Sequence, residues 1–243
     1  MNWNAINLFQ RLYSGEQIKP TVILSYMVVA LCIWKTVPAI PSIEGMPVES
    51  WATFFWGAQK LFLAAVLFGV VPVLLVKLVF REKLADYGLQ LGTHWKEVLL
   101  ATVLLTPAFA VMGYFSNIDG FYSVYPLNPA VLWSAHGGPV QWLVVHTLCY
   151  LVFYYLAFEF FFRGFLFHGL SDSCGLLNAL LIQSAACTFF HFGHPACEIW
   201  GAFGGSLFWG LIVMRTNSIF AGWFQHAALG IMLDVSLVLN LAA

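Results

Sequence analysis

The chain has 243 residues, of which 61% are hydrophobic and only 9% are charged. Soluble domains contain about 45–50% apolar and about 25% charged residues, so this composition excludes a soluble globular enzyme and a disordered chain. The 10 lysines and arginines are balanced by 11 aspartates and glutamates, so no basic excess neutralises phosphates and nucleic acid is excluded as a partner. We therefore expect an integral membrane protein whose immediate partner is the lipid bilayer.

A transmembrane helix needs about 20 mostly apolar residues, because the hydrocarbon layer is about 30 Å thick. In chain order, such stretches fall near 21–41, 56–80, 97–115, 139–168, 176–193, 198–214 and 218–241. The stretch 139–168 is too long for one perpendicular crossing and is either tilted or divided into two pieces. The pattern predicts an all-α polytopic membrane helix bundle with about seven to eight transmembrane helices. We expect one integral membrane domain over 1–243.

Basic residues near the ends of these helices predict the orientation of the chain. They are Arg11, Lys19, Lys77, Arg81, Lys83, Lys96 and Arg215. The loop 116–138 contains no Lys or Arg. Because cytoplasmic loops carry the excess of Lys and Arg, we predict a cytoplasmic amino terminus and an external carboxyl terminus. Lys35 and Lys60 would then lie near the outer helix ends and snorkel towards the interface.

Few ionisable side chains fall far from the ends of the expected helices, namely His146, Glu159, Arg163, His191, His226 and Asp234. A charge in the middle of a transmembrane helix costs about 2.5–3.5 kcal/mol on insertion scales, so each is a candidate for function. Glu159 and Arg163 are four residues apart and share a helix face. Either they form an ion pair that links helices, or burial and Arg163 together tune Glu159 for proton transfer.

Glu159, His191 and His226 are expected at similar depths on three different helices. With cytoplasmic helix ends near 170, 176 and 218, their depths are about 16, 22 and 12 Å at about 1.5 Å per residue. This places a carboxylate and two imidazoles in the cytoplasmic half of the membrane. Such a set can activate water, with Glu159 taking the proton and the histidines orienting water or stabilising an oxyanion.

The same three residues, Glu159, His191 and His226, are an alternative ligand set for a divalent metal such as zinc. The chain lacks the His-Glu-x-x-His pair of zinc proteases, which disfavours that class. A second candidate zinc set, with spacings of four, three and three, consists of Cys187, His191, His194 and Cys197. The intervening Pro195 disfavours it. The 5 cysteines are scattered and odd in number, so we expect buried thiols and no disulfide framework.

These motifs resemble those of the CAAX protease and bacteriocin-processing (CPBP, or Abi) family of intramembrane proteases. The family pattern is Glu-Glu-x-x-x-Arg on one helix, Phe-x-x-x-His on the next, and a later His-x-x-x-Asn/Asp. Glu159 with Arg163 is similar to the first motif, His191 to the second and His226 to the third. The segment 84–89 resembles the loop that often precedes the core, so the resemblance covers about 80–240.

The resemblance implies an intramembrane endopeptidase that cleaves a protein or peptide substrate in or at the membrane, such as a prenylated or other precursor. It implies Glu159, Arg163, His191 and His226 as the catalytic set. Together with the charge pattern, it leads us to expect a bacterial inner membrane location.

This chain departs from the family pattern at three positions. Phe158 replaces the first glutamate, Cys187 replaces the phenylalanine, and Gly230 replaces the Asn or Asp. Two hypotheses follow. In a divergent peptidase, Glu159 or another acid such as Asp234 is the base. In a catalytically silent scaffold or bacteriocin self-immunity protein, the polar cluster serves helix packing. A proton-carrying transporter is less favoured, because the two halves show no matching helices broken by Gly or Pro.

Overall fold

The computed structural model describes residues 15–38, 50–92, 94–116, 120–136 and 140–242, and among these residues there is no β-strand. Six helical stretches are long and apolar enough to cross a membrane: Gln17–Thr36, Gln59–Phe80, Trp95–Phe115, Val140–Cys174, Ala196–Thr216 and Phe220–Leu241. A seventh, Leu176–Phe190, is apolar but has only 15 residues. The prediction of an all-α polytopic membrane bundle is confirmed, and the protein is an integral membrane protein.

The first half of the described chain contains three of the helical stretches that are long and apolar enough to cross a membrane. Its elements are α2 (Gly15–Thr36), α3 (Trp51–Gly57), α4 (Gln59–Ala64), η1 (Ala65–Val70), α5 (Val71–Leu74), η2 (Leu75–Phe80), η3 (Leu84–Tyr87), α6 (Trp95–Phe115), η4 (Phe121–Ser123) and η5 (Pro129–His136). The elements from α4 to η2 form one continuous rod, in which α-helical turns alternate with wider π-helical turns.

The second half is built around a central rod of 35 residues, Val140–Cys174. The rod consists of α7 (Val140–Cys149), η6 (Tyr150–Leu156), α8 (Ala157–Glu159), η7 (Phe160–His168) and α9 (Gly169–Cys174), and is followed by α10 (Leu176–Phe190), α11 (Ala196–Thr216) and α12 (Phe220–Ala242). The stretch expected near 139–168 is therefore one long helix and not two pieces.

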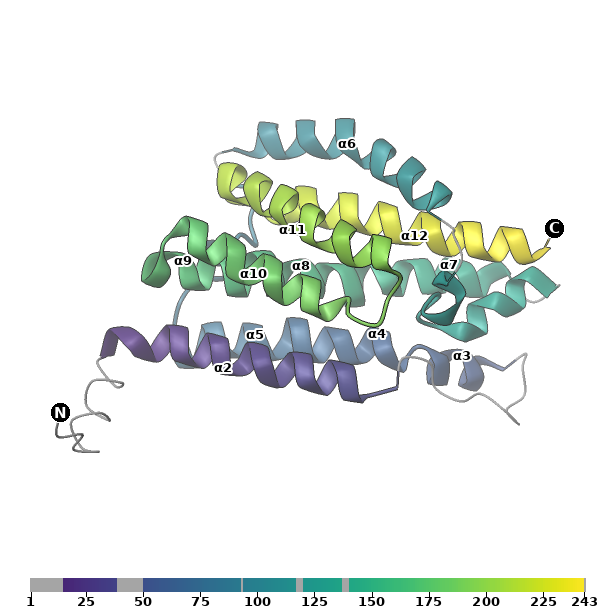
Figure 1. Cartoon of the computed structure of the whole chain (residues 1–243), viewed down its shortest axis with the longest axis horizontal. Coiled ribbons are helices and arrows are strands. Elements are labelled where there is room, and N and C mark those ends of the chain that lie inside the picture. Colours follow the sequence, from purple (N-terminus) through teal and green to yellow (C-terminus); the bar gives the residue numbers. More distant parts are fainter. Residues whose placement is uncertain (1–14, 39–49, 93, 117–119, 137–139, 243) are drawn as a thin grey trace.

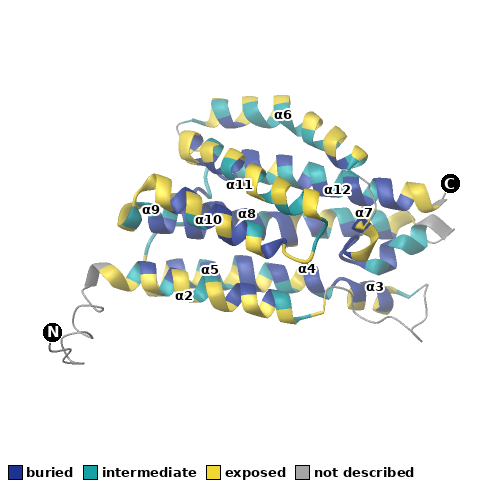
Figure 2. Cartoon of the chain, viewed as in Figure 1, coloured by how far each residue is buried: buried dark blue, intermediate teal, exposed yellow. Residues whose placement is uncertain are grey.

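Figure 1 shows how these helices are stacked. The α2 helix and the 59–80 rod form one layer, the central rod and α10 form the next, α11 and α12 follow, and α6 lies outside α11 and α12. Every residue from 157 to 167 is buried (Figure 2), because this part of the central rod has neighbouring helices on all sides. A helix in such a position must be apolar all round, which explains its run of phenylalanines.

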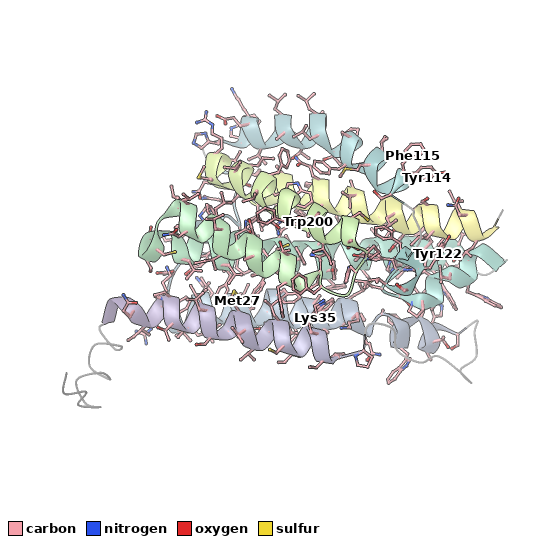
Figure 3. All side chains as sticks on the ribbon, in the orientation of Figure 1. Met27, Lys35, Tyr114, Phe115, Tyr122 and Trp200 are labelled. Carbon is pink, nitrogen blue, oxygen red and sulfur yellow. The ribbon has the colours of Figure 1, made fainter. Side chains whose placement is uncertain are left out.

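The outer faces of the bundle carry large apolar side chains. Phe115 at the end of α6 is 76% exposed and Trp200 on α11 is 75% exposed; both are labelled in Figure 3. Exposed apolar surface of this extent is what a lipid-facing protein requires.

The two lysines expected to snorkel behave differently. Lys60 is only 2% exposed, and its Nζ atom donates to the carbonyl oxygen of Trp34 at 2.9 Å. Lys35 donates to the carbonyl oxygen of Phe192 at 2.5 Å. The snorkelling prediction is wrong for Lys60, because the last carbonyls of α2 lack helical partners and an inward lysine satisfies one of them.

The segment 84–89 folds into the bundle. The carbonyl oxygen of Gly88 accepts a hydrogen bond from the backbone N–H of Ile219, at 2.9 Å. Gly88 has a φ of +76°, and a Cβ atom there would lie 3.2 Å from Nε2 of His168. The α12 helix therefore begins beside His168, inside the bundle, and not at the level of Cys174 where the central rod ends.

Candidate active site

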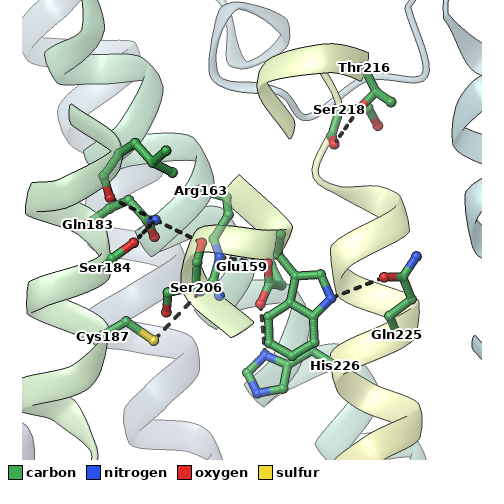
Figure 4. Close-up of polar contacts among 12 residues, drawn as sticks. Glu159, Arg163, Gln183, Ser184, Cys187, Ser206, Thr216, Ser218, Gln225 and His226 are labelled. Carbon is green, nitrogen blue, oxygen red and sulfur yellow. Dashed lines mark hydrogen bonds and ion pairs between the residues drawn. The ribbon is translucent and has the colours of Figure 1, made fainter. Parts of the chain in front are cut away.

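Glu159, at the middle of the central rod, is held between two basic side chains from the rod itself and from α12 (Figure 4). Its Oε1 atom accepts the Nδ1–H of His226 at 2.8 Å, since a carboxylate can only accept. Its Oε2 atom lies 3.4 Å from Nε of Arg163, one helical turn further on. The absence of a side chain at Gly222 lets α12 lie close to the Glu159 carboxylate, because a Cβ atom there would be only 3.0 Å from Oε2. The Glu159 side chain is 0% exposed.

Arg163 is equally buried and is enclosed by aromatic rings. Its guanidinium carbon lies 5.7 Å from the ring centroid of Phe158 and 5.4 Å from that of Trp209. Its Nη1 atom points to Sγ of Cys187 at 3.9 Å. The ion pair considered from the i, i+4 spacing is therefore present, and cation–π contacts with the rings stabilise the rest of the guanidinium group.

His226 presents its second nitrogen to a cavity. Its ring stacks on Trp209, with centroids 4.5 Å apart and an interplanar angle of 26°. Trp209 is fixed in turn by a hydrogen bond from Nε1 to Oε1 of Gln225, at 3.1 Å. Because Nδ1 of His226 is bound to Glu159, Nε2 is the nitrogen left for chemistry in the cavity that the residue lines.

His191 is oriented in a similar way from another helix. Its Nδ1–H donates to the carbonyl oxygen of Cys187, one turn earlier in α10, at 2.7 Å. Its Nε2 atom faces Glu198 on α11, with 3.8 Å to Oε1. The α10 helix is only about 22 Å long by its residue count. Its end and the turn that follows therefore lie within the bundle, where Pro195 caps the start of α11.

The cavity has a volume of about 580 Å³ and mostly apolar walls. Both histidines line it, whereas Glu159 is not among the lining residues. Its other walls include Phe109, Met112, Ser116, Tyr125, Phe208, Leu229 and Leu233. A pocket with a few polar groups converging on apolar walls is the usual form of a binding or catalytic site.

The cavity lies away from the end of the bundle that carries Arg215 and Glu97. It is lined by the second half of α6 and the first half of α11, while Arg215 and Glu97 at the other ends of these helices form an ion pair at 3.0 Å. The cavity is therefore remote from the basic helix ends.

Phe158 lies close to both histidines. Its ring centroid is 6.2 Å from that of His191 and 5.1 Å from that of His226. Thus the structure brings Glu159 and His226 into direct contact and adds His191 at the cavity wall, with an apolar ring close to both imidazoles. His191 makes no described contact with Glu159 itself.

Glu198 is the candidate that sequence reasoning missed, because it falls at the end of an expected span where charges usually set topology. Its side chain is only 15% exposed, and its Oε1 atom accepts the hydroxyl of Tyr125 at 2.6 Å. Nδ1 of His194 lies 3.0 Å from the same oxygen. Burial, followed by the charge of Glu198, raises the pKa of Tyr125, so the phenol stays protonated and donates. The sequence did contain a signal for this site, because Glu198 follows His191 by seven residues and His194 by four.

Asp234 belongs to a separate polar pair. Its Oδ2 atom lies 2.8 Å from Nε2 of His146, and both side chains are 1% exposed. Neither residue lines the cavity. Asp234 is thus placed against the central rod near its start, away from the two cavity histidines.

The expected metal sets do not fit this arrangement. Among the described residues, no three His, Cys, Asp or Glu side chains are placed so that they could hold a metal ion. Glu159 uses Oε1 for His226, and His191 uses Nδ1 for a carbonyl, while Cys187 faces Arg163 and Cys197 is exposed. We derive no step through a metal.

Comparison with known proteins agrees with the motifs. The family model described as type II CAAX prenyl endopeptidase Rce1-like matches residues 140–232. No curated protein and no solved structure matches the chain. The matched stretch runs from the start of α7 into α12 and includes Glu159, Arg163, His191 and His226. Residues 140–232 of this chain are therefore similar to the Rce1-like family of CAAX proteases, within the CPBP family that the motifs resemble.

Proposed function

We propose that this protein is an intramembrane endopeptidase that hydrolyses a peptide bond of a membrane-associated precursor. The observation that carries the proposal is the matched orientation of two histidines from different helices. His191 and His226 each bind a protein acceptor through Nδ1 and are left with Nε2 at one cavity. The family match supports the class of reaction.

In this proposal His226 stabilises the oxyanion that forms when water adds to the peptide carbonyl. A protonated His226 can donate from Nε2 while the Glu159 carboxylate stabilises its positive charge through Nδ1–H. Arg163 holds the other oxygen of that carboxylate. Because Glu159 is fully buried, it acts on the reaction through His226, as a positioning residue.

His191 has a complementary role. Its Nδ1 carries a hydrogen, because the carbonyl oxygen of Cys187 can only accept. In the neutral imidazole Nε2 is then an acceptor, suited to orient an attacking water. The apolar walls of the cavity would accept the hydrophobic part of the substrate.

We also propose that the amino terminus is cytoplasmic, in a bacterial inner membrane. Lys19 pairs with Glu82 at 2.8 Å and Arg215 pairs with Glu97 at 3.0 Å, so the basic helix ends gather at one end of the bundle. The described part of the 116–138 loop, at the other end, has no Lys or Arg. With the basic end inside, the cavity opens in the outer half of the membrane, which favours exported, membrane-anchored precursors as substrates.

The test uses the purified protein in proteoliposomes with internally quenched peptides, one series prenylated at a carboxyl-terminal CaaX cysteine and one unmodified. His191→Ala and His226→Ala should each lower kcat about 10²–10⁴-fold. His94→Ala is the matched control, because His94 is on the surface near the basic end and should leave cleavage unchanged. Wild-type protein that cleaves no peptide, or full activity with both cavity histidines removed, would contradict the proposal.

A second candidate function is a silent scaffold, and the position of Phe158 favours it. An apolar ring stands where the family has its first glutamate, next to both histidines. Under this alternative, Glu159→Gln and His226→Ala would lower folded protein yield and leave no reaction to lose.

A further inference from the structure

We propose that Glu198 is a catalytic residue, which takes the proton of the attacking water while Nε2 of His191 orients the same water. This inference rests on the proposed endopeptidase function and adds a carboxylate that none of the family motifs contains. It supplies an acid at the cavity wall in a chain that has Phe158 in place of the first glutamate of the pattern.

The separation of Glu198 and His191 fits one bridging water. Oε1 of Glu198 and Nε2 of His191 are 3.8 Å apart, too far for a direct hydrogen bond. Both atoms are acceptors in the states described above, and a water has two hydrogens to donate, so it can bind both. The Oε2 atom of Glu198 is buried and has no hydrogen-bond partner among the described residues.

Glu198 is better placed for this role than Glu159. Glu198 lines the cavity, whereas Glu159 does not. Oε1 of Glu159 accepts a hydrogen bond from His226 and Oε2 lies 3.4 Å from Nε of Arg163, so a proton on this carboxylate would weaken the pair with Arg163.

The surroundings of Glu198 indicate a positioned side chain. A carboxylate in the first turn of a helix is favoured by the helix dipole, which accounts for a glutamate in this part of α11. The dipole does not require burial, yet the Tyr125 hydroxyl donates to Oε1 at 2.6 Å and Nδ1 of His194 lies 3.0 Å from the same oxygen. Tyr125 comes from the turn after η4, so the arrangement depends on the tertiary fold.

The step balances without an external reactant. The water oxygen bonds to the peptide carbonyl carbon, and the water proton that is donated to Oε1 of Glu198 passes to that oxygen. The tetrahedral intermediate carries its negative charge on the former carbonyl oxygen, which His226 stabilises. The carbon–nitrogen bond then breaks, and the leaving amine takes the proton from Glu198, which restores the carboxylate.

The test compares Glu198→Gln, Glu198→Asp and wild type in the same proteoliposome assay, with thermal unfolding of each variant. Glu97→Gln, at an exposed ion pair on α6, is the matched control. We expect Glu198→Gln to lower kcat about 10²–10⁴-fold with little change in KM, and Glu198→Asp to retain part of the rate. Wild-type kcat in Glu198→Gln, with loss in His191→Ala, would overturn this inference and leave the endopeptidase function standing.

A second variant covers the case in which Glu198→Gln fails to fold. Tyr125→Phe keeps the ring and removes only the hydroxyl that donates to Glu198. The acid limb of its kcat profile should move to higher pH, because a donor to the charged carboxylate is lost while His191 and His194 remain. An unshifted acid limb in an active Tyr125→Phe protein would count against Glu198 as the base. A wild-type protein without peptidase activity would overturn the proposed function itself.

Discussion

The hydroxyl group of Tyr155 occupies the space in which a side chain at position 230 would begin. A Cβ atom on Gly230 would overlap this oxygen, and both residues line the cavity. The same contact brings His226, one turn earlier in α12, next to the Tyr155 ring, with centroids 4.8 Å apart. Where the family pattern has Asn or Asp, this chain therefore places a polar group from the central rod.

We expect Gly230→Ala to lower the free energy of unfolding by about 1–3 kcal/mol, because the methyl group overpacks the contact with Tyr155. The double variant Gly230→Ala/Tyr155→Ala should lose less than the sum of the two single variants. Thermal unfolding in detergent measures both. Gly201→Ala is the matched control, since nothing lies within 4 Å of a Cβ atom there and alanine favours the helix. Equal destabilisation at positions 201 and 230 would contradict this account.

Removal of the Glu159 side chain should strongly lower the free energy of unfolding. Glu159→Ala leaves Arg163 buried without its counter-charge, which costs about 3–5 kcal/mol. The double replacement Glu159→Leu/Arg163→Met should be milder than Glu159→Ala, because no charge remains buried. For comparison, Glu97→Ala breaks an exposed pair with Arg215 and should cost less than about 1 kcal/mol. If Glu159→Ala and Glu97→Ala unfold alike, the burial argument fails.

Two cysteines report the orientation of the cavity. Cys197 is exposed and lines the cavity, whereas Cys174 ends the central rod near the basic end. In single-cysteine variants, a membrane-impermeant maleimide added outside intact cells should modify Cys197. It should modify Cys174 only after permeabilisation. The reverse pattern would place the amino terminus outside and the cavity on the cytoplasmic side.

Glu82 should make stability depend on pH at the basic end of the bundle. Burial raises the pKa of Glu82, but hydrogen bonds from Lys19 and Tyr87 outweigh it and lower the pKa below its ordinary value of 4.5. The stabilising contribution is therefore fully present above pH 4.5 and is lost as pH falls through the lowered pKa.

The stability difference between wild type and Glu82→Gln should accordingly shrink as pH drops below 4.5. Unfolding temperatures measured from about pH 2 to about pH 7 cover the transition. Lys19→Met removes the main partner and should weaken the dependence. A difference that grows towards acid pH would show the opposite sign and refute the assignment.

The positions of the helices could be predicted from the sequence to a large extent. Hydrophobic runs are local, and all seven expected spans correspond to helices in the structure. Burial inside the bundle could be predicted less well from the sequence. Lys60 was expected at the interface, but it is buried because its Nζ atom donates to the carbonyl oxygen of Trp34, which belongs to another helix.

The sequence identified residues of the candidate site better than it predicted how their side chains are arranged. Glu159, Arg163, His191 and His226 stood out because ionisable groups are rare within the spans, and the structure joins three of them directly. That Glu159 turns away from the cavity could not be predicted, since it depends on the rotation of the central rod against α12. Glu198 was overlooked because its burial depends on Tyr125, 73 residues earlier.

The low content of charge by itself determined that this protein lives in a membrane and which few residues are candidates for chemistry. Only the tertiary structure decided that Phe158 lies close to both histidines and that Glu198 faces His191. The physical reason is range. Hydrophobicity acts on each segment separately, whereas a catalytic arrangement requires side chains from several helices to meet within a few ångströms, which depends on how those helices pack.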